Sequence, residues 1–191
     1  MATSPELLMA WRAGDRAAGN QLFHRHFPAV SRFFRNKVSD SEDLVQATFL
    51  ACVEGRERFE GRSSFRTYLF SVARYQLYGH LRRNRTPVDF GVTSLVDLGT
   101  SITRRIANEQ RGGRLRDALR QLPVEQQAML ELFYWESLSC RQLAEVFEIS
   151  EGSARVRLHR ARRSLGRWFE QQSRDGHQAP SQEAPTRRAS M

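Results

Sequence analysis

The sequence has almost no lysine. Lys37 is the only lysine among 30 basic residues in a chain of 191 residues with a formal net charge of +9. The other basic residues are arginines, whose planar guanidinium groups bind phosphate and guanine bidentately. A positive balance of this size is typical of a protein with a polyanionic partner. A GC-rich coding sequence also favours arginine codons, so only the clustering of the arginines is informative.

Cysteine and long apolar runs are also scarce. Cys52 and Cys140 stand alone, without a CxxC pair, which argues against a disulfide framework and favours a reducing cytosol. No apolar run approaches the ~18 residues that span a bilayer. The first residues, MATSPELLMAWRAGDR, lack the basic start and the apolar core of a signal peptide. We therefore predict a cytoplasmic protein without membrane insertion.

Residue groups that carry enzyme chemistry are missing as well. The sequence contains no HExxH motif, no P-loop and no Ser/His/Asp grouping. His24 and His26 lie two residues apart beside Phe23 and Phe27, a pattern typical of partly exposed helical residues rather than of metal ligands. The sequence predicts no catalytic residue, no metal site and no cofactor.

What the sequence does contain is helical periodicity, which predicts an all-α fold with two small helical domains joined by a flexible linker. Residues 1–85 form the first domain and residues 111–170 the second. Residues 86–110 are rich in Gly, Thr, Pro and Ser and predict a linker, with some helix near 102–110. Residues 171–191 have too little apolar surface to fold and predict a disordered tail.

Capping patterns predict where several helices begin. Ser4 with Pro5 at the first helical position predicts one start, and Ser39 with Glu42 predicts a capping box before a helix at 43–50. Pro28 is expected to kink or restart the second helix. A fourth helix is expected from about 64 to 83, with an inward face formed by Leu69, Val72, Ala73, Leu77 and Leu81.

The segment 139–169 predicts a helix-turn-helix. Ser139 and Gln142 form a capping box for a short helix, and a long helix follows that has six arginines and no acid between Gly152 and Trp168. One face of the long helix is apolar through Ala154, Leu158, Ala161 and Leu165, with Trp168 and Phe169 at its end. The arginines fall largely off this face, so one side can pack while the other meets DNA.

The charges of the first domain change sign along the chain. Residues 40–60 hold six acids against two arginines, whereas residues 61–88 hold six arginines and no acid. Two neighbouring helices of opposite polarity favour two different partners, one a protein and one a nucleic acid. Simple alternation of surface charge is the other interpretation.

Three segments stand in register along the chain: SEDLVQATFL at 41–50, FEGRSSFRTYLFSVARYQLYGHLRR at 59–83, and residues 115–165. Through these segments the chain resembles bacterial RNA polymerase sigma factors of the compact extracytoplasmic-function (ECF) type. The first segment resembles the region 2.2 helix, the second regions 2.3 and 2.4, and the third region 4. The resemblance implies a protein that binds core RNA polymerase and directs promoter-specific transcription, with the polymerase performing the chemistry.

The resemblance implies that the 41–50 helix docks on the clamp helices of the polymerase β′ subunit, and that the β flap is a further contact on the core polymerase. Ala47 stands where the family usually has Glu, which removes one polar contact. An anti-sigma factor is a further partner of many such proteins, and the linker is expected near the RNA exit path. The residues expected to bind core polymerase are Asp43, Leu44, Val45, Gln46 and Phe49.

The resemblance also assigns two DNA surfaces. A base flipped from the −10 element needs a pocket of small residues, backbone donors and a flat surface. Tyr75 stands where members of the family commonly have Asn. For Phe65, packing in the core is the alternative to a contact with DNA. The residues expected at the −10 element are Gly61, Arg62, Ser63, Ser64, Phe65, Arg66, Arg74, Tyr75, Arg82 and Arg83. Those expected at the −35 element are Ser153, Arg155, Val156, Arg157, His159 and Arg160.

Two other functions compete with this interpretation. One is a stand-alone helix-turn-helix regulator in which residues 1–85 form a sensor or dimerisation domain. The acidic 41–50 segment followed by the basic 65–77 segment argues against it. The other is a decoy or adaptor that binds only proteins, which predicts loss of the arginines between 155 and 163, yet these are present. At the turn of the helix-turn-helix, Glu148 stands where such motifs usually prefer Gly. The expected cost is about 1 kcal/mol if the residue is left-handed.

Overall fold

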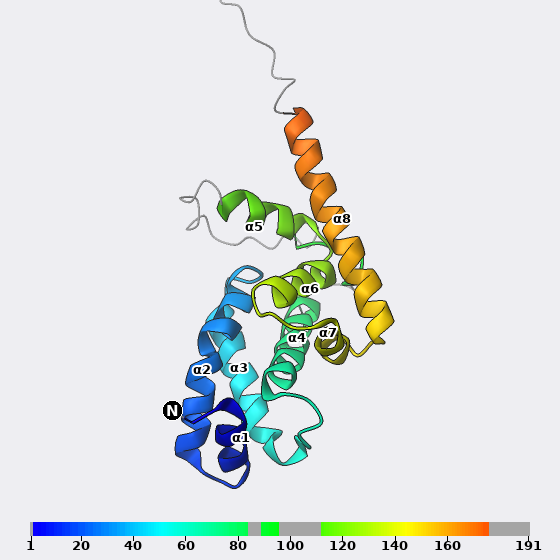
Figure 1. The fold of residues 1–191 in the computed structure, drawn as a ribbon. Coiled ribbons are helices and arrows are strands. Elements are labelled where there is room, and N and C mark those ends of the chain that lie inside the picture. The colour runs from blue at the N-terminus through cyan, green and yellow to red at the C-terminus, as the bar shows by residue number, and fades with distance from the viewer. Residues whose placement is uncertain (1, 84–88, 96–111, 176–191) are drawn as a thin grey trace, which may run out of the picture.

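The computed structural model describes residues 2–83, 89–95 and 112–175. Their regular elements are helical, which confirms the all-α prediction, and Figure 1 shows α1–α4 and α5–α8 as two neighbouring groups. We call these the N-terminal and C-terminal bundles. The α-helices are α1 (Ser4–Arg12), α2 (Arg16–Arg35), α3 (Ser41–Glu54), α4 (Phe65–Arg83), α5 (Gly112–Gln121), α6 (Val124–Tyr134), α7 (Cys140–Phe147) and α8 (Glu151–Asp175), and a 3-10 turn, η1, spans Arg56–Arg58.

The N-terminal bundle packs around aromatic and aliphatic side chains from all four helices. On α4 the inward face is the predicted one, with Leu69, Ala73 and Leu77 fully buried. Near α1, the ring of Trp11 lies so close to the backbone of α2 that a Cβ at Gly19 would stand 2.4 Å from Trp11 Cδ1. Only glycine leaves room for this contact, so it ties α1 to α2.

Two of the predicted helix starts were wrong by one or two residues. Helix α1 is capped by Thr3, whose Oγ1 accepts from the Glu6 amide at 3.5 Å, while Glu6 Oε2 accepts from the Thr3 amide at 2.7 Å. Ser4 is therefore the first helical residue. Helix α3 begins at Ser41 after Asp40, and no side chain caps it, so the predicted box of Ser39 and Glu42 does not form. Short polar residues stand side by side at both places, and the sequence does not choose between them.

Helix α2 continues through its proline. It runs from Arg16 to Arg35 with Pro28 inside it, so the predicted restart does not occur. A proline removes one backbone hydrogen bond. Packing on both sides of it offsets this loss, because Leu22, Val30 and Phe34 of the same helix are fully buried.

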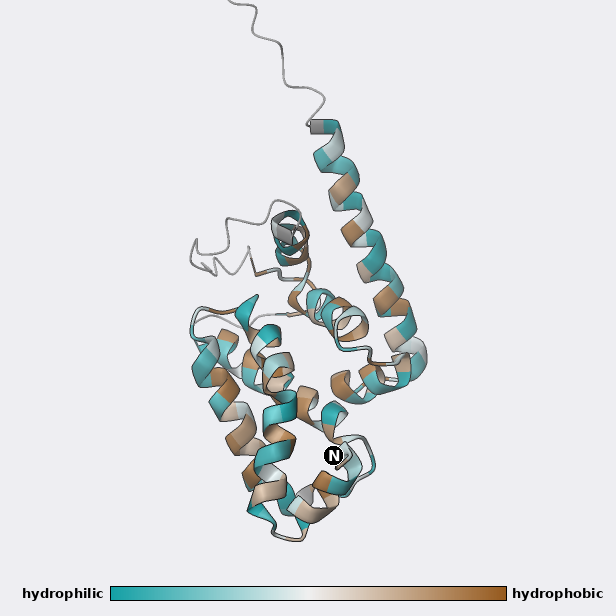
Figure 2. Cartoon of the chain, turned by 60° about the vertical axis from the view of Figure 1, so that its left-hand side comes forward, coloured by the Kyte–Doolittle hydropathy of each residue, from teal (hydrophilic) through white to brown (hydrophobic). Residues whose placement is uncertain are grey.

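The C-terminal bundle contains the predicted helix-turn-helix, formed by α7 and α8. The capping box is confirmed: Ser139 Oγ accepts from the Gln142 amide at 3.2 Å, and Gln142 Oε1 accepts from the Ser139 amide at 2.9 Å. The apolar face of α8 is confirmed as well, with Ala154, Leu158 and Ala161 buried against the other helices. In Figure 2 apolar colours gather where helices face each other, and the outer end of α8 is mainly polar.

Part of the predicted linker is packed. We call residues 89–95 the strap. Phe90 and Leu95 of the strap are buried, and the carbonyls of Phe90 and Thr93 each accept a 3.0 Å hydrogen bond from an amide at the start of α6. The segment was expected to be flexible because it lacks periodicity, but two apolar anchors suffice to hold a short irregular segment. The helix expected near 102–110 lies outside the described residues.

The tail prediction was wrong at its beginning. Helix α8 continues to Asp175, so residues 171–175 are helical rather than disordered. Gln and Arg are good helix formers, and they extend a helix that the bundle has already nucleated. Residues 176–191 lie outside the described part of the chain.

Candidate functional site

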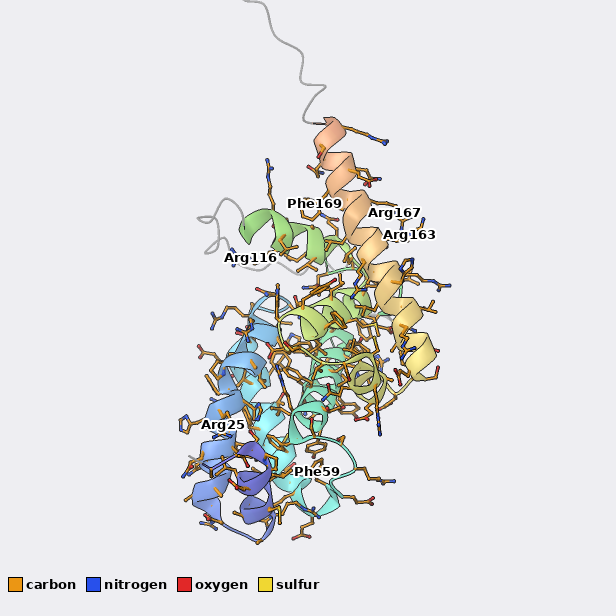
Figure 3. All side chains as sticks on the ribbon, in the orientation of Figure 1. Arg25, Phe59, Arg116, Arg163, Arg167 and Phe169 are labelled. Carbon is orange, nitrogen blue, oxygen red and sulfur yellow. The ribbon has the colours of Figure 1, made fainter. Side chains whose placement is uncertain are left out.

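The recognition helix α8 presents a polar face on the side opposite its buried stripe. Arg155, His159 and Arg160 are exposed, and Val156 keeps half of its surface exposed. Figure 3 shows Arg163 pointing away from α5, while Phe169 lies on the side toward it. This face matches what a helix needs to enter a major groove, with side chains free to reach base edges.

Two residues assigned to the −35 surface are held by neighbours. Ser153 Oγ accepts a 2.9 Å hydrogen bond from Ser150 Oγ, and the Ser153 amide donates to Ser150 Oγ, so Ser150 caps α8. Arg157 is half-buried and forms an ion pair with Glu125 of α6. Arg155, by contrast, pairs with Glu151 one turn away, at 2.5 Å, in an exposed i,i+4 contact of the kind that contributes little. Arg155 is therefore freer to bind DNA than Arg157.

The turn between α7 and α8 contains a left-handed residue. Glu148 has φ 57° and ψ 45° and is the C-cap of α7, where glycine is the preferred residue. The cost expected for Glu148 applied only if this residue were left-handed, and it is. Its carboxylate lies 3.2 Å from Arg74 of the N-terminal bundle.

We expect Glu148→Gly to raise the free energy of unfolding by about 1 kcal/mol relative to Glu148→Ala. Both substitutions remove the contact with Arg74, but only glycine relieves the strain of a Cβ at positive φ. Urea unfolding of the two variants side by side measures the difference. Equal stabilities would show that the turn carries no strain.

The acidic helix α3 shows a mixed polar and apolar face. Asp43 and Gln46 are exposed as a docking surface requires, and Phe49 is half-buried. Leu44 and Val45 are only 4 % and 3 % exposed, so they mainly build the core. The sequence pattern could not separate these roles, because all five residues lie within two helical turns.

Beside this face, an open apolar hollow of about 420 Å³ lies between α2 and α3, and we call it the α2–α3 cleft. Phe27, Leu50 and Val53 keep 51 %, 59 % and 45 % of their surfaces exposed around it. None of these three residues was predicted from the sequence to belong to a site. The sequence feature that could have revealed them is the apolar run FLACV at 49–53, near the end of α3. It is too apolar for a helix face that is turned only to solvent. The residues that line the cleft are Asn20, Phe23, His24, Phe27, Val45, Gln46, Phe49, Leu50 and Val53.

The loop before α4 forms a small hollow of about 180 Å³, which we call the loop pocket. Gly61 adopts φ +74°, a conformation that favours glycine. The ring centroids of Phe59 and Tyr68 lie 4.7 Å apart. Neither residue was assigned to the site from the sequence. Phe65, expected to offer a flat surface, is only 3 % exposed, so its role is core packing. The pocket is lined by Phe59, Glu60, Gly61, Arg62, Ser63 and Tyr68.

The remaining loop residues take different roles. Ser64 Oγ accepts from the Thr67 amide at 3.1 Å and caps α4. Arg62 is exposed and pairs with Glu60 at 2.6 Å. Ser63 is half-buried at the pocket wall. The pocket therefore combines an exposed guanidinium, a small hydroxyl and an aromatic wall.

The arginines of α4 mostly have partners in the C-terminal half. Arg66 lies 2.8 Å from Glu136, and Arg74 lies 3.2 Å from Glu148. Arg82 stacks over the ring of Phe90 in the strap, at 5.3 Å. Arg83 and Tyr75 are exposed, Tyr75 by 74 %. Two arginines assigned to the −10 element, Arg66 and Arg74, are thus held by acids of the C-terminal bundle, while Arg82 and Arg83 remain exposed.

His26 lies next to this cluster, its ring 5.5 Å from that of Phe65. The pKa of His26 is lowered to about 4, mainly by burial and also by the cations of Arg66 and Arg25, whereas the charge of Glu136 opposes this shift. His26 Nε2 is buried without a hydrogen-bond partner among the described residues. The folded protein therefore holds this imidazole neutral.

This lowered pKa predicts a loss of stability in acid. The unfolded chain takes up a proton at His26 below about pH 6.5, but the folded chain does so only near pH 4. The free energy of unfolding should fall as the pH falls from 6.5 to 4. A His26→Gln variant should lose less stability over this range than wild type. Exposed His24→Gln is the control and should follow wild type; identical slopes for all three would contradict the assignment.

Three further properties bear on other classes of function. Among the described residues, no group of three or more His, Cys, Asp and Glu side chains could hold a metal ion. No helix in the described ranges has the length and apolarity to cross a membrane. Cys52 is buried, which raises the pKa of its thiol and leaves it unreactive.

Family comparisons agree with this arrangement. Residues 22–86 match the family Sigma-70 region 2, and residues 112–165 match Sigma-70, region 4. The chain is 30 % identical over 158 residues to RNA polymerase sigma factor CarQ of Myxococcus xanthus, covering 81 % of this chain and 91 % of CarQ. It is also 30 % identical over 171 residues to ECF RNA polymerase sigma factor SigF of Caulobacter vibrioides, covering 83 % and 89 % of the two chains.

Solved structures share the fold. CnrH, in complex with the cytosolic domain of CnrY, matches with a TM-score of 0.66 and 22 % identity, over 86 % of this chain and 95 % of CnrH. Sigma factor RpoE of Bartonella quintana, in complex with the anti-sigma factor NepR, matches with a TM-score of 0.62 and 20 % identity, over 79 % and 96 % of the two chains. With both regions matched and in order, the chain belongs to the ECF-type sigma factors of the sigma-70 family, non-catalytic proteins that direct RNA polymerase to promoters.

Proposed function

We propose that this sigma factor divides its work among three surfaces. The α2–α3 cleft and the acidic face of α3 bind core RNA polymerase, at the β′ clamp helices. The loop pocket and α4 bind the −10 element, and α8 binds the −35 element. The observation that carries the proposal is the separation of one acidic, apolar face from two arginine faces on different helices.

The polymerase surface is supported by its chemistry. Asp43 and Gln46 offer polar contacts, and Leu50 with Phe27 offers apolar area next to them. Protein interfaces commonly combine an apolar centre with a polar rim. The acids of α3 also repel DNA phosphates, which keeps this face free for a protein.

The −10 surface is supported by the loop pocket. A flipped base requires a small recess with an aromatic wall and nearby polar groups, and Tyr68, Ser63 and Arg62 supply these. Arg66, Arg74, Arg82 and Arg83 would then hold the backbone, because phosphate contacts fix the register of the DNA without reading its sequence.

The −35 surface is supported by the exposed face of α8. Arg155, Val156, His159 and Arg160 can reach base edges, and Arg can hold guanine O6 and N7 bidentately. Ser153 and Arg157 would lie near phosphates. The β flap of the polymerase is the protein partner that we propose for the C-terminal bundle.

We further propose that the protein acts in the cytoplasm, with RNA polymerase, and that an anti-sigma factor regulates it. The likeness of its fold to RpoE in complex with NepR supports such a partner. The α2–α3 cleft is the surface we propose for it, because an inhibitor placed there would exclude the polymerase.

The loop pocket can be tested with fluorescent bases. 2-Aminopurine is placed at successive non-template positions of the −10 element, and its fluorescence rises where a base unstacks. We expect a rise at one position only when core polymerase and this protein are both present. A stand-alone regulator would bind the duplex without polymerase and leave every position stacked, and this result would overturn the proposal.

A further inference from the structure

The end of α1 lies beside the loop pocket. Figure 1 shows α1 and the loop before α4 at the same end of the N-terminal bundle. Arg12 is the last residue of α1, and a Cβ added at Gly61 would stand 3.4 Å from Arg12 Nη1. Gly61 itself lines the loop pocket. The guanidinium of Arg12 therefore lies at the edge of the recess assigned to a flipped base.

Helix α1 is fixed in this place by contacts at both of its ends. At its first turn, Arg25 of α2 donates a 2.9 Å hydrogen bond to Ser4 Oγ. At its last turn, the ring of Trp11 is buried, and its centroid lies 5.7 Å from that of Phe65 at the start of α4. Arg12 follows Trp11 directly, so its backbone is held in one position relative to the loop pocket before DNA binds.

The carbonyl groups that end α1 do not depend on the side chain of Arg12. Three of them accept 3.0 Å hydrogen bonds from the amides of residues 13–15, so the backbone itself closes the helix. A cation at a helix C-terminus also stabilises the helix through the macrodipole, and Arg35 does the same at the end of α2. That role needs only a positive charge and does not require a guanidinium placed against the loop.

The guanidinium of Arg12 also has no acid partner in the described part of the chain. Arg12 is exposed, and its donors are open to solvent. The neighbouring cations differ in this respect. Arg62 pairs with Glu60 at 2.6 Å, and Arg66 pairs with Glu136 at 2.8 Å. Arg12 is therefore available for phosphate oxygens, which a guanidinium can bind bidentately.

Helix α1 lies outside the residues that match a known family. The match to Sigma-70 region 2 begins at residue 22, within α2. The segments that resemble ECF sigma factors likewise begin at residue 41. Neither the match nor the resemblance assigns a role to Arg12, so the geometry of this chain alone points to one.

A flipped nucleotide brings a phosphate to the edge of the pocket that receives its base. The base turns out about the backbone, so the sugar and phosphate stay at the mouth while the base enters. A cation at the mouth offsets part of the cost of unstacking the base. Because phosphate contacts position a nucleic acid without reading its sequence, such a cation would act on any base that the pocket accepts.

We propose that Arg12 is a further DNA contact of this sigma factor, and that its guanidinium binds the phosphate beside the nucleotide whose base enters the loop pocket. This role rests on the function proposed for the pocket. The −10 surface then extends from α4 and its loop onto α1. The loop pocket reads the base, and Arg12 holds the backbone next to it.

The test uses the complete protein bound to core polymerase and a fluorescein-labelled forked DNA. The DNA carries the −10 element of a start site found by run-off transcription. A methylphosphonate replaces one non-template phosphate at a time and removes its charge, while 2-aminopurine in a parallel series marks the position that unstacks. Arg12→Ala is compared with Arg35→Ala, because Arg35 is also an exposed arginine that ends a helix.

We expect Arg12→Ala to bind the forked DNA about tenfold more weakly than wild type, and Arg35→Ala to bind it like wild type. The slope of log affinity against log salt concentration should become shallower by about 0.7, the value for one single-strand phosphate contact. A methylphosphonate beside the unstacked position should weaken wild type but not Arg12→Ala. Arg12→Lys keeps the charge and should restore the slope.

Several results would overturn the proposal. Arg12→Ala would bind the DNA as tightly as wild type, or would bind it weakly yet retain the methylphosphonate profile of wild type. An equal loss of affinity for core polymerase would show that Arg12 contacts the polymerase instead. Failure of the proposed function looks different, because no 2-aminopurine position would then unstack even with wild type, and the pocket would lose its role together with Arg12.

Discussion

Arg155→Ala is expected to lower promoter-directed transcription about tenfold to a hundredfold while leaving the affinity for core polymerase unchanged. The guanidinium of Arg155 is exposed at the N-terminal end of α8 and pairs with Glu151 in the same helix. A bidentate arginine–guanine contact discriminates by about 1–3 kcal/mol. Loss of the side chain should therefore affect recognition and not folding.

The measurement is transcription from a promoter that responds to the protein, at matched saturation with core polymerase. Arg174→Ala is the control, because Arg174 is an exposed arginine at the far end of α8. Promoters with single changes in the −35 element add a sharper readout. Wild type and Arg155→Ala should direct equal levels of transcription only from promoters in which the contacted base is changed. An equal loss of transcription and of core affinity would show that Arg155 acts through the polymerase instead.

Leu50→Asp is expected to weaken binding to core polymerase at least thirtyfold, roughly the effect of losing an interface hot spot. Leu50 keeps 59 % of its surface exposed at the rim of the α2–α3 cleft, so the fold does not depend on it. A polymerase bound over this cleft would bury the new carboxylate without a partner. Burial of an unpaired charge is among the most costly changes an interface can receive.

Core binding can be measured by anisotropy of the labelled protein titrated with polymerase. Met9→Asp is a matched control, since Met9 is 72 % exposed on α1 and its replacement adds the same charge elsewhere. Thermal unfolding of both variants should match wild type. If Leu50→Asp binds the polymerase as well as Met9→Asp does, the cleft is not the docking surface.

Much of the fold could be predicted from the sequence, because periodicity and caps are local. The apolar faces of α4 and α8 and the capping box at Ser139 were predicted correctly, since each depends on residues within a few turns. The starts of α1 and α3 were not, because adjacent polar residues compete for the cap. The extension of α8 to Asp175 was missed because a helix that already packs can continue through residues with no apolar face.

The sites were harder to predict because exposure is a tertiary property. The pattern at 43–50 cannot show that Leu44 turns inward while Leu50 remains open. Nor can it show that Arg66 and Arg74 meet acids that lie far away in sequence. Lys37, the single lysine, was visible from the start, but only the fold shows that it lies opposite Glu131. Contacts between the two bundles have no local signature, so these ion pairs emerge only from the structure.

The most direct test of the central claim is run-off transcription with purified core polymerase and a genomic promoter pool, with and without this protein. We expect new start sites that depend on the protein and share two elements at a fixed spacing. Arg155→Ala should weaken these starts, and Leu50→Asp should abolish them. If no new start appears and the protein alone shifts duplex DNA, it would be a stand-alone regulator, and the division of labour among its three surfaces would be contradicted.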